Sequence, residues 1–208
     1  RFYILSSPVR NADNFNFSEK GVEATYKKVL VLLYNVANFY LEYKDEGDEG
    51  FELSDDLMDR WIISRTEELN RIVEENLEKY NTVRACSFAR KYIEDLSTWY
   101  LRNSRERIKE GDIRSRKTLR YVLEKVTKIL APLLPFATEK IFLDINGDGS
   151  VHLQDWPKTD SKLIREDLID KMELLRSQVS SALRQRDQNQ IGIRWPLSKA
   201  IISNNDYD

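Results

Sequence analysis

Apolar side chains recur at helical spacing along most of this chain, and residues 81–111 show the pattern most clearly. At the α-helical step of about 100° per residue, one stripe of this stretch is apolar. Its members are Ala85, Phe88, Ala89, Tyr92, Leu96, Trp99 and Tyr100. The stripe turns polar at Asn103 and Arg107, while the helical pattern continues to Gly111, a good helix stop. We therefore predict a helix that packs in a bundle at its start and projects beyond it at its arginine-rich end.

The same periodicity predicts helices on both sides of this stretch. Four more are expected, at residues 18–44, 54–80, 113–143 and 162–188, with Ser18 and Ser54 as N-caps. Pro132 and Pro135 should kink the third of these, since proline removes a backbone hydrogen bond. Four to five long amphipathic helices with short links predict an all-α, up-down bundle. We also expect an extended segment at residues 150–157 and small strands near the C-terminus, at residues 191–203.

Charge and composition narrow the classes of function. The chain carries 33 Lys and Arg against 35 Asp and Glu, so nucleic acid could bind only at a local basic patch. One cysteine and one histidine exclude a disulfide framework and a Cys/His zinc site. No apolar run is long enough to span a bilayer, and no signal peptide is visible. These features indicate a reducing, cytoplasmic setting.

Motifs of catalysis and metal binding are absent or incomplete. We find no nucleophile elbow, P-loop or glycine-rich dinucleotide fingerprint, so we predict no catalytic residue here. Asp144, Asn146 and Asp148 match the start of a calcium loop. Pro157 stands where the exiting helix of such a loop should already run, which favours a plain turn. We therefore predict no metal site.

A cluster of basic residues occupies the end of the central helix and the start of the next. Residues 99–120 hold eight basic and three acidic side chains in a chain that is slightly acidic overall. One interpretation is a solvated helix corner with ion pairs. The other is a phosphate-binding patch, because the planar arginine fork suits phosphate. The candidate phosphate contacts are Arg102, Arg105, Lys109, Arg114, Arg116 and Lys117.

Two further side chains have both a structural and a functional interpretation. Trp99 is either part of the core or a platform at the rim on which an unpaired base could stack. Asn35 interrupts a helix that is otherwise apolar almost all round. Its amide either satisfies a neighbouring backbone group or reads a base edge.

Several segments resemble a known family. RFYILSSPV, DRWIISR, DLSTWYLRNSRER, LAPLLPFATEKIF, SVHLQDWP and IRWPLSKAII are similar to isoleucyl-tRNA synthetases, which are class I aminoacyl-tRNA synthetases. The resemblance implies that residues 1–16 end a segment joining the catalytic domain and that residues 17–145 form a helical anticodon-binding domain. Residues 146–208 would be a turn, the last long helix and the start of a C-terminal extension. The opening on RFYILSS without an initiator Met indicates a piece of a longer protein.

The resemblance also implies partners and roles. The full-length enzyme, a monomer, would attach isoleucine to its tRNA with ATP and Mg²⁺, whereas this stretch lacks the HIGH and KMSKS signatures and needs no cofactor. Asn35 and Trp99 fall at places similar to anticodon contacts of the methionyl enzymes, and Phe39 stands where those enzymes have an arginine. All three are candidate base contacts. Valyl-, leucyl- and methionyl-tRNA synthetases, or a helical scaffold without RNA binding, remain alternatives.

Overall fold

The computed structural model describes residues 1–7, 17–199 and 201, which divide into two compact units, Arg1–Ile164 and Arg165–Asp208. Each unit is considered by itself. The loop expected at residues 11–16 and the end of the C-terminal tail lie outside the described residues. The domain limits predicted at residues 16 and 145 stay predictions.

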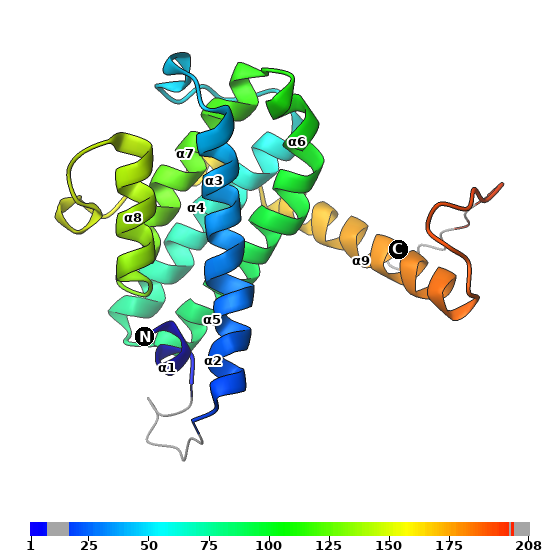
Figure 1. Cartoon of the computed structure of the whole chain (residues 1–208), viewed down its shortest axis with the longest axis horizontal. Coiled ribbons are helices and arrows are strands. Elements are labelled where there is room, and N and C mark those ends of the chain that lie inside the picture. Colours follow the sequence, from blue (N-terminus) through cyan, green and yellow to red (C-terminus); the bar gives the residue numbers. More distant parts are fainter. Residues whose placement is uncertain (8–16, 200, 202–208) are drawn as a thin grey trace. The chain divides into compact units, whose positions relative to one another are not determined.

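The first unit is a bundle of helices (Figure 1). Its α-helices are α1 (Phe2–Leu5), α2 (Glu19–Thr25), α3 (Leu32–Tyr43), α4 (Leu57–Glu78), α5 (Thr82–Glu94), α6 (Leu101–Lys109), α7 (Ile113–Leu130) and α8 (Pro135–Asn146). The π-helical turn Tyr26–Val31 joins α2 to α3, and a second one, Asp95–Tyr100, joins α5 to α6. The all-α fold predicted from the sequence is confirmed.

The second π-helical turn changes which face of its helix is buried. Tyr92, before this turn, and Leu96 and Tyr100, within it, are fully buried, as the apolar stripe predicted. After it, the buried side chains are Leu101, Ser104 and Ile108. A π turn inserts one extra residue and so rotates the following helix about its axis. The projecting end that we expected from the sequence is therefore wrong, because α6 stays packed on a new face and Ile108 is only 1% exposed.

Arg107, at the polar end of the apolar stripe predicted from the sequence, bonds to a buried carboxylate. Its Nη2 donates to Asp59 Oδ1 at 3.0 Å, and the Tyr100 hydroxyl donates to the same oxygen at 2.9 Å. Burial, and then the charge of Asp59, raise the pKa of Tyr100 well above its ordinary value. Tyr100 therefore remains a proton donor to Asp59 in the core.

The helix ends differ from the expected ones for local reasons. Asp56, and not Ser54, caps α4, since its Oδ1 accepts from the amides of Met58 at 2.8 Å and Asp59 at 3.2 Å. Pro135 is the first residue of α8. Instead of the expected kink in one helix, the chain forms two separate helices, α7 and α8. Gly111, at φ +91°, lies two residues after the end of α6 and stops the helical stretch, as expected.

The strands expected near the C-terminus are wrong for the residues that the structure describes there, 191–199 and 201. In the second unit, α9 (Glu166–Gln188) ends in a turn, and Arg186 Nη2 donates to the carbonyls of Gly192 at 2.6 Å and Trp195 at 2.5 Å. These carbonyls are thus bonded locally rather than to a neighbouring strand. In the first unit, Val151–Leu153 is a 3₁₀ turn where an extended segment was expected.

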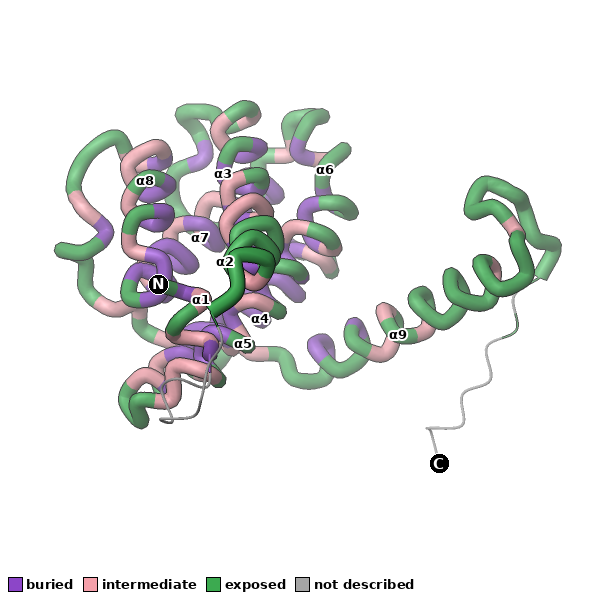
Figure 2. Tube along the Cα trace, turned by 60° about the horizontal axis from the view of Figure 1, so that its bottom comes forward, coloured by how far each residue is buried: buried purple, intermediate pink, exposed green. Residues whose placement is uncertain are grey.

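The buried residues of the first unit lie along the sides of its helices that face other helices, and Figure 2 colours these stretches of the backbone tube purple. The largest fully buried ones include Trp61, Tyr40, Tyr92 and Tyr100, so aromatic residues supply much of the core. Among the described residues, no helix is long and apolar enough to cross a membrane.

Candidate nucleic-acid interface

A surface hollow of about 420 Å³ lies between α3 and the continuous helical segment formed by the second π-helical turn and α6. Its lining comes from α3, from the π-helical turn and from α6, as Asn35, Asn38, Phe39, Glu42, Ser97, Leu101, Arg102 and Arg105. In Figure 1, α3 and α6 run through neighbouring parts of the bundle. The hollow therefore brings together four residues predicted as RNA contacts from segments that lie more than sixty residues apart, Asn35, Phe39, Arg102 and Arg105.

Phe39 and Arg105 form the best defined contact of this hollow. The Arg105 guanidinium lies over the Phe39 ring at 5.1 Å from its centroid. Phe39 is only 6% exposed and also packs against Tyr43, with ring centroids 4.8 Å apart. Since Arg105 covers the ring and is itself exposed, the surface open to a base at this point is the guanidinium.

Arg102 and Arg105 are exposed guanidinium groups that line the hollow. Neither makes an ion pair with a carboxylate in the part of the chain that the structure describes. An uncompensated guanidinium in a hollow can bind a phosphate through charge-assisted hydrogen bonds. These two residues are therefore the strongest candidates of the predicted set for phosphate contact.

Trp99 lies one helical turn before Arg102 and is half-buried. Its backbone carbonyl accepts from Asn103 Nδ2 at 2.7 Å. Trp99 is thus not part of the fully buried core, and its role as a stacking platform at the rim stays a prediction. Trp99 is two residues from Ser97 and Leu101, which line the hollow.

The remaining candidates for phosphate contact already have acidic neighbours. Lys109 pairs with Glu106 of its own helix at 3.3 Å. Arg114, Arg116 and Lys117 lie on α7, against the acidic segment at residues 45–55. Their nearest carboxylates are Asp55 at 3.5 Å from Arg114, Asp48 at 2.9 Å from Arg116 and Glu52 at 3.8 Å from Lys117. Phosphate contact by these residues stays a prediction.

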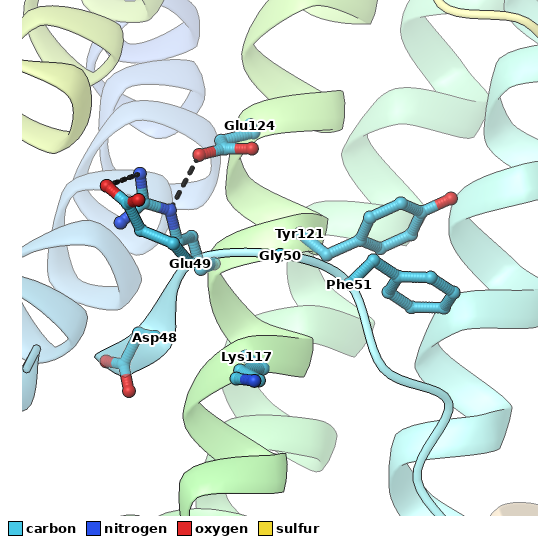
Figure 3. A pocket seen from close by; sticks show the side chains of 8 residues that line it. Asp48, Glu49, Gly50, Phe51, Lys117, Tyr121 and Glu124 are labelled. Atoms are coloured by element: carbon cyan, nitrogen blue, oxygen red, sulfur yellow. Dashed lines mark hydrogen bonds and ion pairs between the residues drawn. The ribbon is translucent and has the colours of Figure 1, made fainter. Parts of the chain in front are cut away.

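The acidic segment at residues 45–55 is an ordered strap across α7. Asp45 and Asp48 form a capping box around a 3₁₀ turn, and Asp48 is fully buried against Arg116. Figure 3 shows the next residues crossing α7, where the Phe51 ring lies 4.2 Å from that of Tyr121. The Asp-x-x-Asp spacing of a capping box is the signal that could have revealed this order.

Two side chains of the turn that resembles a calcium loop bond within α8. Asp144 accepts from Lys140, and Asn146 Nδ2 donates to the Phe142 carbonyl at 3.0 Å. Among residues 1–7, 17–199 and 201, no group of three His, Cys, Asp or Glu side chains is placed to hold a metal ion.

An all-α bundle with uncompensated arginines beside a polar and aromatic hollow is suited to single-stranded RNA, whose bases are splayed out and stacked on guanidinium or aromatic planes. Residues 59–201 match the family model of the anticodon-binding domain of tRNA ligase, and the chain belongs to this family.

Its curated relatives specify the family further. The chain is 32% identical over 203 residues to the isoleucine–tRNA ligase of Mycobacterium tuberculosis. The matched region covers 98% of the chain and 20% of the relative. The chain is 39% identical over 153 residues to the isoleucine–tRNA ligase of Cutibacterium acnes, which covers 71% of the chain and 14% of the relative. The chain thus spans about a fifth of the length of its relatives or less. The resemblance to isoleucyl-tRNA synthetases is confirmed, and it is favoured over the sister enzymes and the scaffold.

Proposed function

We propose that this chain recognises the anticodon arm of an isoleucine tRNA, as one part of an isoleucine–tRNA ligase. The observation that supports the proposal is the hollow between α3 and α6, where side chains predicted to contact bases and phosphates meet. The full-length enzyme would be a cytoplasmic monomer that attaches isoleucine with ATP and Mg²⁺. This chain would supply recognition and no chemistry.

The hollow suggests how recognition would proceed. Arg102 and Arg105 would attract and position the phosphates of the loop, because their charges are not already compensated. Asn35 would test a base edge with an amide that both donates and accepts. Trp99 would stack on a neighbouring base. Because Arg105 is already held on Phe39, less side-chain entropy is lost when it binds.

Binding of isolated anticodon stem-loops tests the proposal. The isoleucine stem-loop should bind more tightly than the valine and methionine stem-loops, and log K should fall linearly with log[salt]. Fluorescence titration at several salt concentrations measures both quantities. Equal affinity for all three stem-loops would contradict isoleucine specificity, and salt-independent or absent binding would contradict RNA recognition itself.

Trp99→Ala should weaken stem-loop binding by about 1–3 kcal/mol, the value of one base stacked on an aromatic side chain. The free energy of unfolding should fall by less than the about 3–5 kcal/mol expected for a fully buried tryptophan, since Trp99 is half-buried. Titration and urea unfolding measure the two effects. Phe136→Ala is a matched control, because that ring is 90% exposed and lies outside the hollow. A Trp99→Ala variant that melts early and binds normally would refute the stacking role.

A further inference from the structure

We infer that Glu42 is a specificity residue of the hollow and that it selects a base edge with two adjacent N–H donors, which among the RNA bases is the Watson–Crick edge of guanine. This inference rests on the proposed function, since it assumes that the hollow receives a base of the anticodon loop.

Glu42 differs from the paired carboxylates of the strap. The carboxylates of the strap, such as Asp48 and Glu52, pair with cations of α7. Glu42 lines the same hollow as Arg102 and Arg105, yet it forms no ion pair or hydrogen bond with any residue that the structure describes. An exposed carboxylate left unpaired beside two guanidinium groups remains available as an acceptor for a ligand.

The neighbours of Glu42 extend this acceptor into a pattern. Asn35, Asn38 and Glu42 follow one another at spacings of three and four residues, and all three line the hollow. Such spacing places them on one face of α3, with Asn38 and Glu42 about 6 Å apart along the axis. One wall of the hollow therefore presents amide groups that donate and accept, followed by a carboxylate that only accepts.

Guanine matches this order of groups. Its Watson–Crick edge offers the O6 acceptor, then the N1–H and N2–H donors, so that an asparagine amide can donate to O6 while Glu42 accepts from both nitrogens. Adenine and cytosine each offer one amino group beside a ring-nitrogen acceptor, whose lone pair a carboxylate repels. Uracil offers a single N–H between two carbonyl oxygens. Only guanine satisfies both carboxylate oxygens.

The two walls of the hollow thus have separate tasks. The polar face of α3 reads the base, whereas Arg102 and Arg105 of α6 bind the backbone. It follows that a change at Glu42 alters the choice of base, while a change at either arginine weakens binding for every sequence.

Inosine provides a direct test, because it differs from guanine only in lacking the 2-amino group. We would titrate the chain with anticodon stem-loops in which each anticodon position carries guanine or inosine in turn. At one position the unaltered chain should bind guanine about tenfold more tightly, as expected for loss of part of a bidentate contact. In Glu42→Gln that ratio should fall close to one, because the amide nitrogen faces an N–H donor. Glu75→Gln, an exposed glutamate of α4 outside the hollow, should leave the ratio unchanged.

The outcomes separate this inference from the proposed function. If Glu42→Gln preserves the guanine-to-inosine ratio at every position, or tightens binding to all loops equally, Glu42 acts through charge alone and the inference is wrong. Salt-dependent binding that still needs Arg102 would then leave the proposed function intact. If the unaltered chain binds no stem-loop, the proposed function fails, and this inference fails with it.

Discussion

Glu67→Ala is expected to lower the free energy of unfolding by about 3–5 kcal/mol, the cost of removing one partner of a buried ion pair. Glu67 is fully buried. One of its carboxylate oxygens accepts from Lys125 Nζ and from the Tyr121 hydroxyl, the latter at 2.6 Å. The other accepts from the backbone amide of Asp160 at 2.8 Å. The substitution therefore leaves a buried ammonium group uncompensated and releases the segment around Asp160 from α4.

Urea unfolding measured by circular dichroism checks this expectation. The matched control is Glu67→Met combined with Lys125→Met, which replaces both charges with apolar groups of similar length. Because the desolvation penalty of both ions disappears, the double variant should recover most of the lost stability. A loss below about 1 kcal/mol for Glu67→Ala would show that the charge is compensated in another way. A double variant as unstable as the single one would show that packing, not charge, explains the loss.

Arg102→Ala combined with Arg105→Ala is expected to weaken tRNA binding by about 100-fold or more, since hydrogen bonds to charged groups contribute about 1.5–3 kcal/mol each. The loss should be similar for every tRNA, because phosphate contacts carry no sequence information. The slope of log K against log[salt] should become shallower by about 1.4, at about 0.7 for each of the two phosphate contacts to a single strand. Titration over a range of salt concentrations measures both effects.

Arg114→Ala is the control for the arginine pair. Arg114 is also exposed to solvent, but it lies 3.5 Å from Asp55 and 3.7 Å from Glu52. Its charge is already partly compensated, so its removal should change the salt slope less than removal of Arg102 or Arg105. Equal changes in slope would mean that the acidic strap does not screen α7. No change in the double variant would exclude the hollow as the phosphate site.

Much of the fold follows from periodicity alone, and the exceptions have identifiable causes. The apolar stripe correctly predicted that Tyr92 and Leu96 are buried. It missed the rotation after Tyr100, because a π-helical turn adds one residue to a turn without any glycine or proline to mark it. It also missed the order of the strap, which depends on the distant partners Arg116 and Tyr121.

The candidate site was predicted only in part. Local composition pointed to Arg102 and Arg105, but it treated Arg114 and Arg116 as equivalent to them. The difference lies in which carboxylates reach each guanidinium, and these come from residues 45–55. The sequence pattern did not select Glu42, because a single glutamate on a helix surface is common. Only the structure shows that it lines the same hollow as Arg102 and Arg105. Its spacing from Asn35 and Asn38 is the signal that was present.

The sequence by itself determined the all-α class, the helical stretches and the family, since apolar periodicity and family segments are properties of neighbouring residues. Only the tertiary structure decided which of the basic residues remain uncompensated and which polar residues meet them. Those properties depend on α3 and α6 lying side by side and on the strap covering α7. Charged groups pair only when they lie within a few ångströms of each other in space, and the separation of two residues along the sequence does not give that distance.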